Sequence, residues 1–414
     1  KAFVTNIAGT SYGNMETFVT TGDQPVVTIL NATDIEPHSA TLNGSLNPGL
    51  LPTTVEFEYG TSTEYGNNIT ASPSPVSGDI EVVISAGLSG LAPGAEYHCR
   101  IRAENSLGVI YSNDMTFTTT GELPSVETAD VTELKLSTAT LNGSVNPNLL
   151  STTVVFEWGD SETYGNRAAP DQSPLAGSTA GDINAILSGL NPGTVYHYRI
   201  AATNELGTTY SGDKTFKTYV VADADNNYYY SVTIGTQTWM QENLRSTKFR
   251  DGSAITQITG NSAWKDLSTS AYCWYNNEET LNKNLFGALY NWFAASSGKL
   301  CPAGWHIPTN SEWIALTNFL GGEIAAGDKI KEAGSVNWGD LNSGTNETGF
   351  TALPGGSRTD SGTFANKGIS GQFWSTSPVL PATSYSAVLY NNSTSLTRVS
   401  SPNVSGHSVR CIKD

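Results

Sequence analysis

Charged side chains are scarce in this 414-residue chain, where Asp, Glu, Lys and Arg together make up only 14% of the sequence. Long helices and coiled coils are rich in these residues, so the composition argues against both. Basic residues are the scarcest, since 21 Lys and Arg stand against 38 Asp and Glu, for a formal charge of −17. Phosphate contacts need a basic face, which excludes nucleic acid as a partner. An anionic lipid surface would also repel the chain.

Long apolar runs and cysteines are sparse as well. No run approaches the roughly 18 apolar residues of a membrane-spanning helix, so we expect no membrane span. Four cysteines are too few for a disulfide scaffold and too scattered for a CxxC metal site. Gly (41) and Pro (18) are plentiful, which is typical of turn-rich β structure. The first residue, Lys1, falls inside a predicted strand, and we expect the chain to be cut from a longer precursor.

An internal repeat organises the first half of the chain. Glycines recur at Gly9, Gly108 and Gly207, 99 residues apart, within related segments that begin AFVTN, IRAEN and IAATN. The same offset relates LNGS at Leu42 to LNGS at Leu141, and it also relates FEYG to FEWG. Each copy alternates apolar and polar residues in short runs, separated by Asn-Pro and Pro-Gly turns. This pattern predicts an immunoglobulin-like β-sandwich.

The segments LAPGAEYHCRIRAENSLG (91–108) and LNPGTVYHYRIAATNELG (190–207) resemble the fibronectin type III family. The resemblance implies two full sandwiches, at 23–121 and 122–218, and the last two strands of a truncated unit at 1–22. A sandwich buries its core between two sheets, so residues 1–22 cannot bury their own apolar side chains. The predicted fold class is therefore multidomain, with tandem all-β sandwiches ahead of a different C-terminal domain at 219–414.

The composition changes after residue 218. Residues 1–218, the stalk, hold 23 acidic and 8 basic side chains (net −15), whereas residues 219–414, the head, hold 15 and 13 (net −2). The head also holds eight of the nine Trp. We expect a hairpin at 228–241, helices at 286–295 and 311–320, and loops with short strands beyond Gly334. The second helix has an N-terminal capping signal in the run Thr309 to Glu312.

The head resembles the Fibrobacter succinogenes major paralogous domain, which is found in exported bacterial proteins of Bacteroidota and Fibrobacterota. The segments that carry the resemblance include IGTQTWMQENL (234–244), WHIPTNSEW (305–313), PGGSR (354–358), GQFWSTSP (371–378) and SVRCIKD (408–414). Two of them, WHIPTNSEW and PGGSR, also resemble the formylglycine-generating branch of the C-type-lectin-like fold. The resemblance implies an α+β lectin-like head, with a strand at 231–240 paired to one at 408–413. It also implies export, which permits a disulfide between Cys301 and Cys411.

Enzyme signatures are weak, and we expect no catalytic residues and no cofactor. The run GTSYG at 9–13 fits a nucleophile elbow, but that elbow needs a strand-turn-helix setting, and the repeat replaces Ser11 by Ile110 and Thr209. The formylglycine branch works with closely spaced cysteines near its C-terminus, where this chain has only Cys411. In the head, His306 and His407 lie in no metal-binding spacing.

A weak calcium candidate lies at the start of the head. Asp223, Asp225 and Asn227 have the D-x-D-x-N spacing that can wrap a calcium ion with hard oxygens. The segment lacks the glycine and the distant Glu of an EF-hand, so a solvated turn is the alternative interpretation.

The head also holds an aromatic and amide-rich stretch at 374–403, predicted as a loop region that could carry a ligand surface. Aromatic faces stack on sugars or on protein side chains, and Asn and Arg supply directional hydrogen bonds. The candidate ligand-binding residues are Trp374, Tyr385, Tyr390, Asn391, Asn392 and Arg398. For Trp374 the alternative is core packing, and for residues 390–392 it is an exposed turn.

Two classes of function stay open. The first is an exported, cell-surface, adhesin-like protein, in which the acidic stalk presents a lectin-like head to a glycan or a cell-surface protein. The second is a structural subunit of a surface layer or extracellular filament, in which neighbouring copies are the partners. An exposed aromatic patch on the head would favour the first class, and sandwich edges paired with another chain would favour the second.

Overall fold

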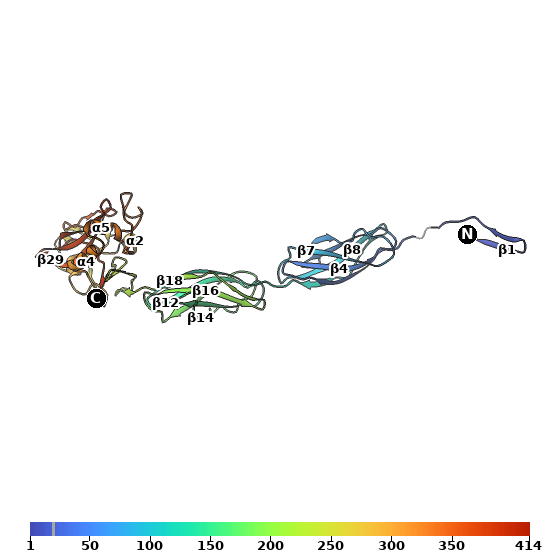
Figure 1. The fold of residues 1–414 in the computed structure, drawn as a ribbon, viewed down its shortest axis with the longest axis horizontal. Helices are drawn as coiled ribbons and strands as arrows, with labels where there is room; N and C mark the ends of the chain where they lie inside the picture. Colours follow the sequence, from blue (N-terminus) through green and yellow to red (C-terminus); the bar gives the residue numbers. More distant parts are fainter. Residues whose placement is uncertain (19–20) are drawn as a thin grey trace.

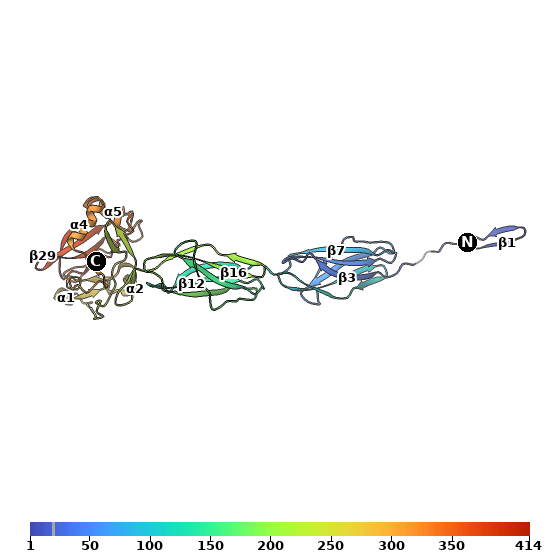
Figure 2. The same cartoon turned by 60° about the horizontal axis from the view of Figure 1, so that its bottom comes forward.

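The computed structural model describes residues 1–18 and 21–414, which form a row of separate units (Figure 1). A hairpin of β1 (Phe3–Asn6) and β2 (Gly9–Tyr12) comes first. Two elongated β-sandwiches follow end to end, and a rounder unit lies at the opposite end of the row (Figures 1 and 2). In the described residues, no helix combines the length and the apolar character needed to cross a membrane.

The first sandwich packs two antiparallel sheets against each other. One sheet has the order β3 (Val26–Thr33), β4 (Ser39–Asn47), β7 (Val82–Ser89). The other has the order β10 (Met115–Thr118), β8 (Glu96–Asn105), β5 (Thr54–Gly60), β6 (Asn67–Thr70), with β9 (Gly108–Tyr111) also paired to β8.

The second sandwich repeats this arrangement. Its smaller sheet has the order β11 (Ser125–Thr132), β12 (Thr138–Asn146), β15 (Gly181–Ser188). Its larger sheet has the order β14 (Asn166–Ala168), β13 (Thr153–Gly159), β16 (Val195–Asn204), β17 (Gly207–Tyr210), and β18 (Lys214–Lys217) also pairs with β16.

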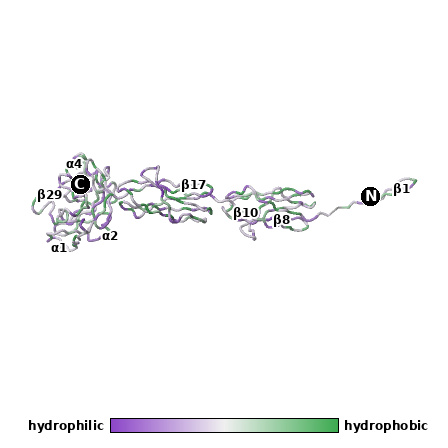
Figure 3. Tube along the Cα trace, turned by 90° about the horizontal axis from the view of Figure 1, so that it is seen from below, coloured by the Kyte–Doolittle hydropathy of each residue, from purple (hydrophilic) through white to green (hydrophobic). Residues whose placement is uncertain are grey.

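The period-2 alternation of the sequence accounts for both sandwich cores. Leu42, Phe57 and Ile101 are fully buried between the sheets of the first sandwich, while the intervening polar residues face outward. Hydrophobic and hydrophilic segments accordingly alternate along both sandwiches (Figure 3). The Tyr97 hydroxyl accepts a hydrogen bond from the Ala92 amide (2.9 Å), and the equivalent Tyr196 hydroxyl accepts one from Asn191 (2.9 Å). Each Tyr thereby fixes the corner that leads into a central strand.

The joints between units are short and hydrogen-bonded. Between the sandwiches, His38 Nε2 lies 2.7 Å from Glu122 Oε1. Between the second sandwich and the head, the Gly193 amide donates to the Tyr219 carbonyl (3.1 Å), and the Tyr219 ring in turn stacks on Tyr228 within the head. These contacts leave little free chain between neighbouring units.

The head is built from short strands with helices on its surface. One small sheet has the strand order β21 (Ser231–Ile234), β22 (Gln237–Met240), β32 (Ile412–Lys413), β26 (Trp305–His306), and another has the order β23 (Thr256–Gln257), β24 (Ala271–Cys273), β25 (Leu289–Tyr290). Two further sheets have two strands each: β19 (Val221–Ala222) with β20 (Tyr228–Tyr229), and β27 (Ser357–Arg358) with β28 (Phe364–Ala365). The pairing of β22 with β32, through Trp239 and Ile412, joins the first and last segments of the head.

A longer antiparallel meander crosses the head. It consists of β29 (Ser370–Leu380), β30 (Thr383–Tyr390) and β31 (Thr397–Pro402). The helices are α1 (Asn261–Lys265), α2 (Glu279–Phe286), α3 (Trp292–Ala295), α4 (Asn310–Phe319) and α5 (Glu323–Ile330).

The sequence correctly predicts helix α4, but its helix prediction after residue 286 is wrong. At α4, Thr309 caps the helix and forms a reciprocal capping box with Glu312, as the sequence predicts. The helix expected at 286–295 is wrong. Residue 286 ends α2, because Gly287 adopts φ +73° and a Cβ there would lie 2.7 Å from the Leu244 carbonyl oxygen. The chain then enters β25 before the single turn of α3 begins.

Two of the three hydrophobic core clusters of the head lie on opposite faces of the meander. Phe373, Ala387 and Leu389 pack on one side with residues of α4 and α5, whereas Trp374 belongs to the cluster on the other side. A disulfide between Cys301 and Cys411 lies in that second cluster and spans 110 residues of sequence. Cys99 and Cys273 are buried free thiols, and burial raises the pKa of each to about 12. Both thiols therefore stay protonated and unreactive near neutral pH.

Candidate functional site

The stretch from 374 to 403, expected from the sequence to be a loop region, is largely the β29–β31 meander. The expectation failed because the strands combine apolar residues with many Ser and Thr, which hides their period-2 pattern. Trp374 is fully buried, and its indole Nε1 donates to the Tyr290 carbonyl (2.6 Å). It is therefore a core residue rather than a ligand contact, and the interpretation of Trp374 as an anchor is corrected.

The remaining candidates fall into two groups, and Tyr385 and Arg398 form the first. Arg398 of β31 pairs with Ala387 of β30, so the two side chains lie on the same face of the sheet. Tyr385 lies two positions before Ala387 on β30 and therefore shares that face. Both Tyr385 and Arg398 are half-buried. Tyr390 lies at the other end of β30, five residues or about 17 Å of extended strand from Tyr385. The six candidates therefore do not form one contiguous patch.

The second group, Tyr390, Asn391 and Asn392, forms the turn that follows β30. Tyr390 is 42% exposed, and Asn392 is also exposed. The backbone N–H of Asn391 donates a hydrogen bond to the Ile369 carbonyl (2.9 Å). The buried Lys331 ammonium donates to the carbonyls of Tyr390 (3.2 Å) and Ser393 (2.8 Å). This turn is thus an exposed aromatic and amide surface on a fixed backbone, which suits recognition.

The calcium candidate at the start of the head is a hydrogen-bonded turn. Asp223 accepts bonds from the Asn227 side-chain amide (2.8 Å) and the Tyr229 hydroxyl (2.6 Å). Asp225 accepts bonds from Thr247 and lies 3.1 Å from the Lys248 ammonium, and these donors hold the pKa of Asp225 below its usual value despite its partial burial. The carboxylates are engaged by protein donors, and Asn227 presents its NH₂ group to Asp223. The calcium interpretation is therefore corrected to a structural joint.

A small, mainly apolar pocket lies beside the disulfide, with a volume of about 160 Å³. Its lining includes Leu300, Cys301, Trp305, Ile307 and Thr376. His306 stands at its rim, with Nε2 2.8 Å from Glu312 and Nδ1 2.6 Å from Asp414. These two carboxylates raise the pKa of His306, although its partial burial acts in the opposite direction. The pocket has room for a group of about five water volumes, the size of one side chain.

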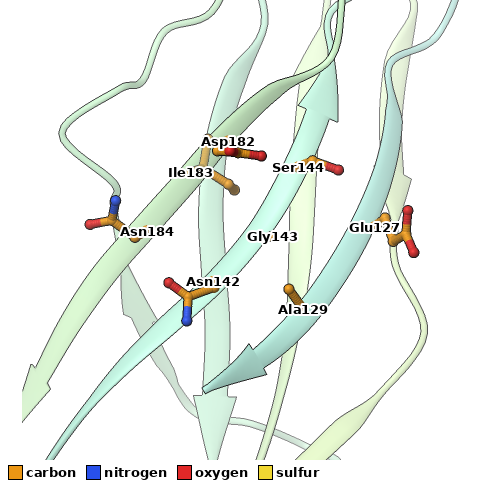
Figure 4. A pocket seen from close by; sticks show the side chains of 8 residues that line it. All are labelled: Glu127, Ala129, Asn142, Gly143, Ser144, Asp182, Ile183 and Asn184. Carbon is orange, nitrogen blue, oxygen red and sulfur yellow. The ribbon is translucent and has the colours of Figure 1, made fainter. Parts of the chain in front are cut away.

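The stalk has a larger but shallower depression on the outer face of β11, β12 and β15, with a volume of about 570 Å³ (Figure 4). Its floor consists of short side chains such as Asn142, Ser144 and Asn184 (Figure 4). The side-chain NH₂ group of Asn142 already donates hydrogen bonds to the Asp130 carbonyl (2.9 Å) and the Thr132 hydroxyl (3.1 Å), across a bulge in β11. This depression is a solvated sheet face with no converging groups.

The larger sheet of each sandwich carries a polar cluster that was not predicted from the sequence. In the first sandwich, Arg100 lies between the rings of Tyr65 (4.4 Å) and Tyr111 (4.1 Å) and pairs with Glu58 (2.8 Å). The Tyr65 hydroxyl donates to Asp114 (3.0 Å). Each of these five residues has an equivalent 99 positions later in the second sandwich, where Arg199 pairs with Glu157. The repeat offset, applied to tyrosines and charged residues as well as to glycines, would have revealed the cluster.

Comparison with known proteins gives a family match for the head. Residues 232–413 match the model of the Fibrobacter succinogenes major domain family, and this match spans most of the head. No curated protein matches the chain. The family match covers neither sandwich.

Solved structures resemble parts of the chain. The sensor domain of the anti-sigma factor RsgI4 from Pseudobacteroides cellulosolvens matches in a short form (17% identity, 24% of this chain and 98% of that chain, TM-score 0.20) and in a long form (24%, 26%, 100% and 0.20). The FN1–FN3 domains of chicken CNTN1 match with 16% identity over 47% of this chain and 65% of that chain, with a TM-score of 0.26. None of the three says what this chain binds.

Proposed function

We propose that this chain is an exported, cell-surface recognition protein, in which the acidic β-sandwich stalk holds a lectin-like head away from the surface to bind a glycan or a protein. The observation that carries the proposal is the linear order of the units, with the head at one end of two sandwiches in line (Figures 1 and 2). Such an arrangement gives a binding domain reach.

Charge and covalent chemistry support this proposal. The stalk carries a net charge of −15 in residues 1–218, and mutual repulsion keeps such a stalk soluble and disfavours its folding back on itself. The Cys301–Cys411 disulfide fits an oxidising, extracellular location. Fibronectin type III ancestry of the sandwiches and a C-type-lectin-like fold of the head are part of the same proposal.

Within the head, we assign the ligand contact to the turn at 390–392. Tyr390 offers an exposed ring face, and Asn392 offers an amide beside it. Tyrosine and asparagine give adaptable contacts at low entropy cost, and the Lys331 ammonium already holds the backbone of the turn. Little ordering is then needed when a ligand binds.

The test is a binding screen with the full chain on a glycan array and on whole bacterial and host cells. A Tyr390→Ala/Asn392→Ala variant should lose the signal, while a Tyr385→Ala/Arg398→Ala variant at the other end of β30 serves as the matched control. Loss of binding by the control alone would move the ligand surface to that end of the meander. Absence of any signal from the wild-type chain would reject the recognition role.

The second candidate function, a structural subunit, is favoured by exposed apolar side chains on strands. In the β1–β2 hairpin, Phe3 is 70% and Val4 is 69% exposed. On the sheet edges, Val83 in β7 is 71% and Ile186 in β15 is 76% exposed. Such edges can accept a strand from another copy. Concentration-dependent association of the full chain in analytical ultracentrifugation, abolished by Val83→Lys/Ile186→Lys, would support this candidate over the first.

A further inference from the structure

Three metal-ligating side chains converge on the second sandwich, beside the polar cluster of its larger sheet. Glu162, His197 and Asp213 each place one ligand atom within 4.8 Å of the other two. They come from the β13–β14 loop, from β16 and from the β17–β18 loop. We propose that these residues bind one divalent transition-metal ion of the zinc class.

The local fold explains why Glu162 reaches His197. Gly159 pairs with His197 across β13 and β16, and a Cβ at Gly159 would lie 1.6 Å from the Tyr164 carbonyl oxygen. Only glycine therefore lets the loop fold back over the strand that carries His197. The loop closes as a turn, in which the Tyr164 amide donates to the Ser161 carbonyl (2.9 Å) and Tyr164 itself adopts φ +59°.

A supporting layer of hydrogen bonds orients the ligands. The Tyr164 hydroxyl donates to Asp213 Oδ1 (3.2 Å), while Asp213 Oδ2 lies 2.8 Å from His197 Nδ1. The Arg199 guanidinium lies 4.6 Å from the centre of the Tyr164 ring and is held by Glu157 (2.8 Å). In metal sites, such outer partners fix the orientation of the ligating carboxylate and raise the affinity.

The chemistry of the three ligand side chains indicates which class of metal ion would bind. One imidazole and two carboxylates supply three protein ligands, which leaves a fourth position for water in a tetrahedral zinc site. Imidazole nitrogen favours zinc, copper and nickel over magnesium and calcium, which prefer oxygen alone. Ligand atoms around a tetrahedral zinc ion lie about 3.3 Å apart. The His197–Asp213 pair must therefore open by a few tenths of an ångström, which Asp213 can do because it lies on an exposed loop.

The other histidine–carboxylate groups of the described chain lack this convergence. The two carboxylates at His306 contact opposite ring nitrogens, so they cannot share one ion. His98 forms the repeat-equivalent pair with Asp114 (2.8 Å), but Thr63 occupies the position of Glu162. The carboxylate of the first sandwich, Glu64, lies one residue further along the same turn. At this point of the turn the first sandwich thus has Thr63-Glu64, where the second has Glu162-Thr163.

Exchanging these two residues gives a test at constant composition and charge. The full chain is dialysed against ZnCl₂, and the bound metal is measured for the wild type and for two variants. The wild type should bind one zinc ion tightly, and E162T/T163E should weaken that binding at least tenfold while leaving the melting temperature of the metal-free chain unchanged. The reciprocal variant T63E/E64T should bind a second zinc ion. Millimolar Mg²⁺ or Ca²⁺ should not displace either ion.

A His197→Gln variant separates this site from other zinc ligands on the chain, because it removes the nitrogen and keeps both carboxylates. It should lose the zinc ion in the same way as E162T/T163E. The proposal is overturned if the wild type binds no zinc, or if both E162T/T163E and His197→Gln bind it as tightly as the wild type does.

Discussion

The indole of Trp374 packs against the imidazole of His407 inside the head, with ring centroids 4.4 Å apart. Both residues are buried, and neither ring nitrogen of His407 has a hydrogen-bond partner among the described residues. Burial lowers the pKa of His407 to about 3. A neutral imidazole is therefore built into the core at the point where β29 passes the segment that leads to the last strand.

This histidine should make the head sensitive to acid. The unfolded chain binds a proton at His407 below about pH 6.5, whereas the folded chain binds it only near pH 3. The free energy of unfolding should therefore fall as the pH falls from about 6.5 toward 3. Chemical denaturation of the wild type and of His407→Gln at pH 7, 5.5 and 4 measures this contribution as a difference in pH dependence.

Comparing the two proteins at each pH removes the contributions of other groups. Glu242, for example, has a pKa raised by burial, which gives the opposite slope in both proteins. The wild type should lose more stability than His407→Gln between pH 7 and pH 4. Parallel curves would show that the buried imidazole has gained a partner, such as a water molecule.

The disulfide should be a major source of stability for the head. Cys301 and Cys411 close a loop of 110 residues, and restricting the unfolded chain by a loop of that length contributes about 4–5 kcal/mol in the chain-entropy model. A Cys301→Ala/Cys411→Ala variant should unfold at a markedly lower denaturant concentration in its head transition. The sandwich transitions should stay unchanged, since their cores contain neither cysteine. An equal loss in all transitions would contradict this assignment.

Gly159 should be intolerant of a side chain. Gly159→Ala brings a Cβ against the backbone of Tyr164, so we expect a loss of about 1–3 kcal/mol from the second sandwich. Gly181→Ala is the matched control, because a Cβ at that strand position meets nothing within 4 Å. The control should stay within about 0.5 kcal/mol of the wild type. Thermal denaturation of both variants checks the pair, and equal melting temperatures would show that the loop can move away.

The sequence predicts the repetitive part of the fold better than the head. Glycines recur every 99 residues at Gly9, Gly108 and Gly207, and apolar and polar residues alternate strictly around Phe57 and Ile101. These two patterns leave few alternatives to a β-sandwich. In the head, strands such as β25 and β26 are two residues long. Such strands are fixed by tertiary contacts and leave no periodic signal, so the helix expected at 286–295 could not be distinguished from a broken one.

Candidate site residues were harder to predict for a related reason. The exposure of a residue depends on what packs against it, and Trp374 and Tyr390 are both followed closely in the sequence by Ser and Thr. The structure buries Trp374 completely and leaves Tyr390 42% exposed. The cluster of Glu162, His197 and Asp213 spans 51 positions of the numbering and becomes visible only when three segments are brought together.

Trp374 and Tyr390 should respond to mutation in opposite ways. Trp374→Ala removes a fully buried indole, and we expect it to cost about 3–5 kcal/mol of stability. Tyr390→Ala should leave the melting temperature nearly unchanged and weaken ligand binding by about 1–3 kcal/mol. Thermal denaturation and a binding assay on the same two proteins would show this. Lost stability in Tyr390→Ala with intact binding would make Tyr390 a structural residue.

The most direct test of the recognition role compares the full chain with residues 1–218 on the same panel of glycans and cells. The stalk can serve as the control because each sandwich has its own core, which shares no residue with the core of the head. The account predicts that the full chain binds a defined ligand and that residues 1–218 do not. Equal binding by residues 1–218, or no binding by either protein, would contradict it.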